Sequence, residues 1–541
     1  MNSGSPWVWL NAGAVAISLV LLFGLLGLIA VRGLGYFWPG QVLVANYQPP
    51  GQAMLTVAGE MIARETVPSS RLPGMTGDTF TRSLLHQGNR DLTGADFVWL
   101  VDPWLSNCQY PVDIMVFEHR EWGNFYGFLA SVQENGTTII ASDESARAVF
   151  DERLDRAQVI YQTIRQIEKH DIGAINAELE RLRLAQRRME LSGDRDPVQL
   201  AGITAQRQQL NQAHLALETQ LVDLYLALNR DSFTATTATG QVVEQPISAV
   251  VQAWQPNGLS YMDKLAFFAR KVAAFILDNP REANTKGGVF PAIVGTVMMV
   301  ILMSIMVTPF GVLAAIYLHE YARQGWMTRA IRVAVTNLAA VSSMVYGVFG
   351  LGFFVYFAGG HIDQWFFAEA LPAPTFGTPG LLWAAITLAL LTLPVVIVAT
   401  EEGLARIPRS VREGSLALGA TQAETLWRVV LPMASPAMMT GLILAVARAA
   451  GEVAPLMLVG VVKLAPGLPL DGNFPYLHLD QKFMHLGFHI FDVGFQSPDV
   501  EVVKPLVYAT ALLLVAVIAA LNLSAVAIRN HLREKYKNLE D

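Results

Sequence analysis

Arg448 and Glu452 lie four residues apart in a long hydrophobic stretch that is predicted to cross a membrane. This spacing puts both side chains on one face of a helix, but Arg before Glu is the weaker order for a helix-surface pair. A charge near the middle of a bilayer is costly unless it is paired or hydrated. Two interpretations stay open. The pair forms a polar patch on a translocation path, where Arg448 meets an anion, or it is a buried pair that locks this helix to a neighbour.

A second candidate site is a polar, arginine-rich loop between two apolar stretches. Its spaced motif consists of Glu413, Gly414, Ser415, Gly419, Leu431 and Pro432. Ser410 with Glu413, and Thr421 with Glu424, have the spacing of capping boxes, which begin helices. Gly419 suits the left-handed residue that ends a helix, and the Leu-Pro pair is expected to stop the second helix. The pattern predicts two short helices joined by a turn, a knob on one membrane face.

This loop resembles the EAA loop of bacterial ABC importer permeases, whose usual spacing is EAA-x3-G-x9-I-x-LP. Every spacing matches, with Gly414 and Ser415 where alanines are usual and Val429 where isoleucine is usual. In that family the loop docks into a cleft on a separate ATPase subunit. The resemblance therefore implies a role in ATPase coupling for Glu413, Gly414, Ser415, Gly419, Leu431 and Pro432. The alternative is an ordinary amphipathic loop whose capping boxes serve stability alone.

Further segments narrow the resemblance. The run Ala447–Leu456 is similar to the ARAxGExAPL run of PstA-type phosphate permeases. Other segments that resemble this subfamily are Gly287–Thr296, Ile316–Ala322, Asn337–Gly350 and Thr400–Glu402. The resemblance covers about Gly287 to the C-terminus. It implies that Arg448 offers charge-assisted hydrogen bonds to the anion, while Glu452 keeps the empty path from being strongly positive. The region before Gly287 looks like the N-terminal extension of a long-form PstA subgroup.

Composition indicates several membrane spans plus a soluble part, because 52% of the 541 residues are hydrophobic and the mean hydropathy is +0.37. The formal charge of −7 speaks against a nucleic-acid partner. The single cysteine, Cys108, excludes an intrachain disulfide. The sequence contains no G-x-x-x-x-G-K-[ST], G-x-S-x-G or H-E-x-x-H motif. We therefore expect no enzyme, no catalytic residues, no cofactor and no metal site.

Six apolar stretches reach the roughly 20 residues that a membrane span needs. They are Trp7–Val31, Val289–Leu318, Val333–Ala358, Leu381–Thr400, Ala437–Gly460 and Pro505–Ile528. The first lacks the basic start of a signal peptide, so we expect a retained anchor. Arginines and lysines gather in the loops after the second and fourth spans and in the tail. This distribution predicts that both chain ends are cytoplasmic, although Arg32 opposes it locally.

Residues 33–286 are then expected to form an extracytoplasmic domain. Ile114–His119 and Tyr126–Val132 flank a turn and predict a β-hairpin. Between residues 151 and 230, apolar side chains advance by three and four residues alternately, which is typical of a coiled-coil seam. The turn at Ser192–Pro197 makes this region an antiparallel helical hairpin. The amphipathic segment Met262–Leu277 fits either a helix on the outer membrane surface or a packed helix of the domain.

Together these patterns predict an α-helical polytopic membrane protein with six transmembrane helices and a type I ABC importer permease core. An extracytoplasmic β-rich domain is expected to carry the antiparallel helical hairpin. The expected divisions are an anchor at 1–32, an extracytoplasmic domain at 33–286 with the hairpin at about 151–230, a permease domain at 287–530 with the EAA loop at 401–432, and a cytoplasmic tail at 531–541.

The resemblance implies a permease subunit that moves inorganic phosphate across the bacterial inner membrane. The implied partners are a PstC-like second permease, a dimer of a PstB-like ATPase and a PstS-like periplasmic phosphate-binding protein. One alternative is a permease for another oxyanion, such as sulfate or molybdate. Another is a membrane-anchored signalling or scaffold protein whose hairpin is the working part, which leaves the motif loop and the midplane charges unexplained.

Overall fold

The computed structural model describes residues 5–68, 79–121, 123–141, 144–193, 196–281, 286–323, 325–497 and 500–537. The chain divides into two compact units. The helical unit comprises Met1–Tyr36 and Phe275–Asp541, and the β-rich unit comprises Phe37–Ala274. Residues 194–195 of the expected hairpin turn and residues 538–541 of the expected tail lie outside the described residues.

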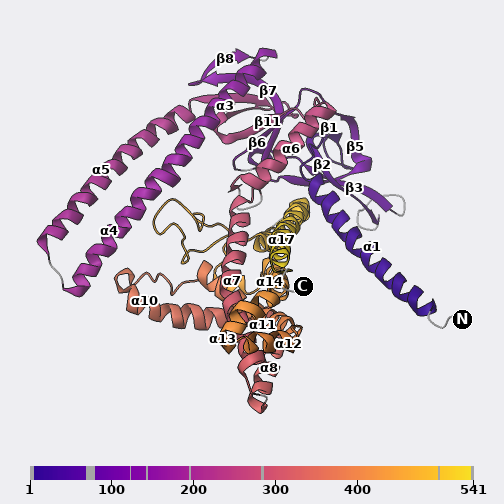
Figure 1. Cartoon of the computed structure of the whole chain (residues 1–541). Helices are drawn as coiled ribbons and strands as arrows, with labels where there is room; N and C mark the ends of the chain where they lie inside the picture. Colours follow the sequence, from indigo (N-terminus) through magenta and orange to yellow (C-terminus); the bar gives the residue numbers. More distant parts are fainter. Residues whose placement is uncertain are drawn as a thin grey trace. The chain divides into compact units, whose positions relative to one another are not determined.

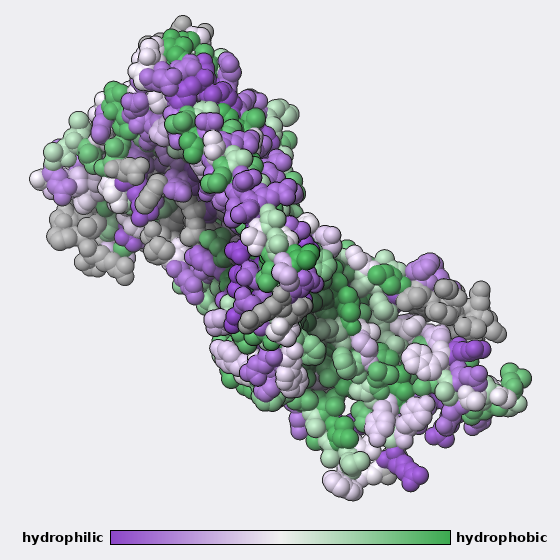
Figure 2. Space-filling view, turned by 90° about the vertical axis from the view of Figure 1, so that its left-hand side faces the viewer, coloured by the Kyte–Doolittle hydropathy of each residue, from purple (hydrophilic) through white to green (hydrophobic). Residues whose placement is uncertain are grey.

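Within the described residues, six helices are long and apolar enough to cross a membrane. They are Val8–Gly35, Phe290–Tyr321, Ser343–Phe366, Leu381–Ala405, Gln422–Gly451 and Val503–His531. Their main helical elements are α1 (Ser5–Gly35), α7 (Phe290–Ile316), α9 (Ser343–Phe349), α11 (Leu381–Ala405), α14 (Leu431–Gly451) and α17 (Val500–Lys537). Hydrophobic residues dominate the visible face of the helical unit in Figure 2, as expected for helices surrounded by lipid.

Two spans differ from the sequence-based expectation. The expected third span began at Val333, but Val333–Leu338 belongs to a separate helix, α8 (Trp326–Leu338), and α9 starts after Ser342 turns to an extended backbone. The expected fifth span reached Gly460, but α14 ends at Gly451 because Glu452 is extended, with φ −80° and ψ 131°. A short helix, α15 (Leu456–Val459), follows. Hydropathy cannot detect such breaks, because the broken segments stay apolar.

The core of the helical unit forms around α11, which packs between α7 and α14. Two glycines allow this close packing. A Cβ on Gly311 of α7 would lie 2.6 Å from Val396, and a Cβ on Gly441 of α14 would lie 2.5 Å from Ala399. Small residues at such crossings let helix backbones approach closely in a membrane. The three helices therefore form one tightly packed body.

The β-rich unit contains two antiparallel sheets. One has the strand order β4-β3-β2-β1-β5, and the other β10-β9-β7-β6-β11 with β8 paired to β7. The first five strands are Val42–Tyr47, Leu55–Pro68, Thr79–His86, Phe97–Val101 and Leu105–Gln109. The second sheet uses β6 to β11, which are Met115–His119, Asn124–Glu134, Thr137–Ala141, Asp231–Thr236, Val242–Pro246 and Val250–Trp254. Pairing of β6 with β7 confirms the predicted β-hairpin.

The helical hairpin interrupts the second sheet between β8 and β9. Its first arm runs through α3 (Glu144–Gln166), a π-turn at Ile167–Asp171 and α4 (Ile172–Ser192), and its second arm is α5 (Pro197–Leu228). Figure 1 shows α4 and α5 side by side. Asp196 caps α5 by accepting from the Val198 N–H, with Pro197 in the first turn. The first arm begins at residue 144, earlier than residue 151, because the apolar pattern continues into the domain core.

An ionic cluster around the buried Asp231 fixes the base of the hairpin to the sheet. Asp231 at the start of β9 is 3% exposed, and its carboxylate accepts from Arg156 at 2.7 Å and from Arg230 at 2.9 Å. Arg153 of α3 lies 3.9 Å from the same carboxylate. Glu134 of β7 pairs with Arg230 at 2.9 Å. The cluster joins the first arm, the end of the second arm and two strands, so it orients the hairpin.

The segment 262–277 lies in α6 (Tyr261–Leu277), which packs on the β-rich unit. Phe267 is buried, with its ring centroid 5.0 Å from that of Trp254 on β11. Lys271 forms an ion pair with Glu118 of β6. Of the two alternatives, the structure therefore supports the packed helix of the domain.

Candidate functional site: the coupling knob and the broken fifth span

The motif loop folds into the two-helix knob that its sequence predicts, with one local difference. It consists of α12 (Arg409–Ala417), a turn, and α13 (Gln422–Thr425). Gly419 has φ +90° in the turn, and Thr421 forms a complete capping box with Glu424. The predicted box of Ser410 with Glu413 is wrong. The helix already starts at Arg409 after Pro408, so Ser410 lies inside its first turn and caps nothing.

The expectation that Leu431 and Pro432 stop the second helix is also wrong. The chain continues from α13 through a π-turn at Leu426–Val430 directly into α14. Pro432 lies in the first turn of α14, where a missing N–H is tolerated. The knob is therefore joined to the fifth span without a loop between them.

The six motif residues divide into a packed side and an exposed side. Leu431 belongs to an apolar cluster under the knob that also contains Ile316, Leu404, Ile407, Leu426, Val430 and Ala434. The Ser415 hydroxyl lies 2.9 Å from that of Thr425 and ties α12 to α13. Glu413, Gly414 and Gly419 are exposed. The motif thus both builds the knob and forms part of its surface.

Two apolar residues on the knob surface were not singled out from the sequence. Leu418 in the turn is 91% exposed, and Trp427 is 64% exposed. Tryptophan is enriched among the residues that anchor protein interfaces, so Trp427 is the stronger candidate of the two. An apolar residue directly before a left-handed glycine is a signal that could have indicated this surface.

Arg448 and Glu452 meet, but not on a continuous helix face as the sequence predicted. Arg448 lies in the last turn of α14, and Glu452 follows the helix end. The Arg448 Nε is 3.5 Å from the Glu452 Oε1, and the two side chains are 33% and 22% exposed. A guanidinium has five N–H donors. One ion pair at this distance leaves donors for an anion at the break in the span.

The break is closely packed on its other side. A Cβ on Gly347 of α9 would lie 2.7 Å from the Cα of Pro455, so only glycine permits this contact without movement. The third span therefore packs directly against the chain that follows the break.

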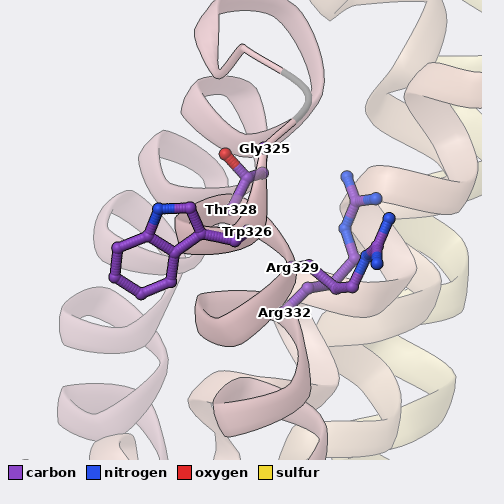
Figure 3. A pocket seen from close by; sticks show the side chains of 5 residues that line it. All are labelled: Gly325, Trp326, Thr328, Arg329 and Arg332. Carbon is purple, nitrogen blue, oxygen red and sulfur yellow. The ribbon is translucent and has the colours of Figure 1, made fainter.

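A surface pocket of about 240 Å³ lies at α8, lined by Gly325, Trp326, Thr328, Arg329 and Arg332. In Figure 3 the side chains of Arg329 and Arg332 extend to the same side of the helix, away from the Trp326 ring. Arg332 donates to the Glu401 carboxylate at 3.3 Å and to the Leu318 carbonyl at 3.3 Å. In the sequence, this arginine is one of the basic residues that indicate topology, and nothing there points to these two partners. Across the described residues, no group of three or more His, Cys, Asp or Glu side chains could hold a metal ion.

Comparison with known proteins decides the family. Residues 307–538 match the family model of the binding-protein-dependent transport system inner membrane component. The probable ABC transporter permease YqgH of Bacillus subtilis (strain 168) is 34% identical over 36% of this chain and 59% of its own length. The probable phosphate transport permease PstA of Methanocaldococcus jannaschii is 32% identical over 36% of this chain and 63% of its own length. PstA 1 of Mycobacterium tuberculosis (strain CDC 1551 / Oshkosh), a phosphate transport permease, is 32% identical over 45% of this chain and 71% of its own length.

The chain belongs to the PstA family of permeases. It is a multi-pass membrane permease of the ABC transporter class, as its fold and these relatives agree. The chain spans 59% and 63% of the length of the first two relatives. The family match begins at residue 307, so the β-rich unit of this PstA-type permease lies outside it.

Proposed function

We propose that this PstA-type permease carries inorganic phosphate across the bacterial inner membrane as one subunit of an ABC importer. The observation that carries the proposal is the Arg448 guanidinium, which is partly exposed at the point where the fifth span breaks. Two relatives are named phosphate transport permeases, which supports phosphate as the anion. Arg448 would bind it by charge-assisted hydrogen bonds, and Glu452 would balance the positive charge when the path is empty.

The proposed energy source is a dimer of a separate, PstB-like ATPase. The knob docks into the ATPase through Glu413, Gly414 and Gly419, with Leu418 and Trp427 as apolar anchors at its surface. Ser415, Leu431 and Pro432 keep the knob in shape and connect it to the fifth span. Closure of the ATPase dimer on ATP then moves the knob, and the spans rock to alternate access.

The proposed orientation has both chain ends in the cytoplasm and the β-rich unit in the periplasm. Its supports are the arginines beside the knob and their absence from the loop 359–380. A PstC-like permease completes the path, and a PstS-like binding protein delivers phosphate to the periplasmic side.

Cysteine labelling tests this orientation in a Cys108→Ser background, because Cys108 is exposed. An impermeant thiol reagent should label Ser192→Cys in the hairpin from outside the cell. It should label Arg409→Cys in the knob only after the cells are permeabilised. The reverse pattern would overturn the topology.

Transport itself is tested with the complete complex in proteoliposomes. ATP-driven, binding-protein-dependent uptake of phosphate is expected, and a large excess of sulfate should not compete. Competition by sulfate or molybdate would assign the alternative oxyanion function. Failure of any ATPase subunit to co-purify with the permease would reject the importer proposal altogether.

A further inference from the structure

The cytoplasmic end of α7 is a π-turn at Tyr317–Tyr321, closed by a hydrogen bond from the Ala322 N–H to the Tyr317 carbonyl at 2.8 Å. Two arginines from different helices hold this turn. Arg412 of α12 binds the Glu320 carboxylate, and Arg332 of α8 binds the Leu318 carbonyl.

Arg412 is the connection between the knob and this turn. Its guanidinium donates to the Glu320 Oε1 at 2.9 Å, to the Leu404 carbonyl at 2.9 Å and to the Ile407 carbonyl at 3.1 Å. The side chains of Arg412 and Glu320 are 19% and 23% exposed, so solvent screens the pair weakly. One side chain on α12 therefore binds the end of α11 and the end of α7 together.

Arg332 repeats this arrangement from the other side. It donates to the Leu318 carbonyl in the π-turn and to the Glu401 carboxylate near the end of α11, both at 3.3 Å. The ends of α7 and α11 are thus bridged twice, once from α8 and once from the knob. The bridge from the knob is the one that the ATPase could move.

We infer that Glu320 is a positioning residue that transmits motion of the knob to the second span through its ion pair with Arg412. The apolar cluster under the knob allows sliding, because dispersion contacts have no preferred direction. A short charge-assisted hydrogen bond fixes both distance and direction. This inference rests on the proposed docking of the knob to an ATPase, and it adds the route by which the motion reaches α7.

A purely structural role for Arg412 is the competing explanation, because cations at the end of a helix stabilise its free carbonyls. Glu320→Gln separates the two. Glutamine keeps the size of the side chain and a hydrogen-bond acceptor, and it leaves the bonds of Arg412 to Leu404 and Ile407 in place. It removes the charge that makes the bond to α7 strong. The nearby His319 Nδ1, 3.0 Å from the Glu320 Oε1, can still bind the amide oxygen.

The experiment uses the complete complex in proteoliposomes and measures three quantities, namely ATPase subunit bound, ATP hydrolysed and phosphate transported. Glu320→Gln should bind the ATPase and hydrolyse ATP normally, yet transport about tenfold less phosphate per ATP, since losing a charged hydrogen bond changes an equilibrium by about that factor. Arg412→Gln should lose at least as much, because it also removes the bonds to the Leu404 and Ile407 carbonyls. The double variant should lose no more than Arg412→Gln alone, because the ion pair is already absent there. Arg329→Gln is the matched control. This exposed arginine makes no ion pair with another described residue, and transport per ATP should stay near the wild-type value.

Wild-type transport per ATP in Glu320→Gln would overturn the inference, and so would a Glu320→Gln complex that fails to assemble, since the pair would then serve folding. Additive losses in the double variant would also overturn it. Absence of the ATPase from the wild-type complex is a different result, because it rejects the proposed function before Glu320 is tested.

Discussion

Replacing Gly419 by valine should uncouple transport at normal membrane abundance. Gly419 has φ +90°, and a Cβ added there would meet nothing within 4 Å. The substitution therefore causes no collision, and its cost is backbone strain alone. A left-handed backbone costs a non-glycine residue roughly 1–2 kcal/mol, and a β-branched residue tolerates it least. A penalty of about 2 kcal/mol lowers the equilibrium constant between the native turn and its alternatives roughly thirtyfold.

The assay compares phosphate uptake and ATPase association at equal amounts of permease in the membrane. Gly414→Ala is the matched control, because a Cβ at this exposed position also meets nothing within 4 Å while the residue lies inside α12. Alanine there should be neutral or stabilise the helix by up to about 1 kcal/mol. Gly419→Asn should fall between the two, since asparagine enters left-handed conformations more easily. Normal uptake by the valine variant would refute the view that the shape of this turn matters for coupling.

Three further predictions concern charged and titratable residues. Arg448→Lys keeps the positive charge but loses the planar arrangement of N–H donors, so phosphate uptake should fall at least about tenfold. Near-normal uptake by a double Arg448→Gln, Glu452→Gln protein would instead support the interpretation that the two residues form a buried structural pair. Asp231→Asn should destabilise the β-rich unit by about 1.5–3 kcal/mol, measured by thermal or denaturant unfolding, because it removes the buried charge that accepts from the partly exposed Arg156 and Arg230. Burial lowers the pKa of His485 from 6.5 to about 4. As the pH falls from 6.5 to 4, the unfolded chain binds a proton that the folded chain does not, so the free energy of unfolding should fall by up to about 3 kcal/mol. His485→Gln should flatten this pH dependence in thermal unfolding.

The sequence predicted features that depend on neighbouring residues. Apolar length located six spans, and the Thr421 capping box was correct because both partners lie within one turn. The Ser410 box has the same pattern, yet Pro408 starts the helix earlier and leaves Ser410 inside it. A proline can end a helix or lie in the first turn of one, and the residues around Pro432 are compatible with both positions. Local pattern alone does not decide between such alternatives.

Contacts between distant segments were beyond the sequence. Arg412 and Glu320 are 92 residues apart, and Arg332 and Glu401 are 69 residues apart. Each arginine appeared in the sequence as one more basic residue of a cytoplasmic loop. Their partners are fixed by the packing of α7 against α11, which depends on small residues such as Gly311 and on the whole helical unit. The Arg448–Glu452 pair was predicted, but the helix end between its members was not.

The continuous path from the knob into the fifth span has a mechanical consequence. The helical segment Gln422–Gly451 carries the knob near one end and Arg448 near the other. At 1.5 Å per residue, the distance between Gln422 and Arg448 along this rod is about 39 Å. A tilt of about 5° at the knob then displaces the far end by about 3 Å, which is about the length of one hydrogen bond. Such a displacement would make or break the contact that Arg448 is proposed to form with an anion. The π-turn at Leu426–Val430 and Pro436 within α14 are the two points in this segment where a bend would absorb part of the movement.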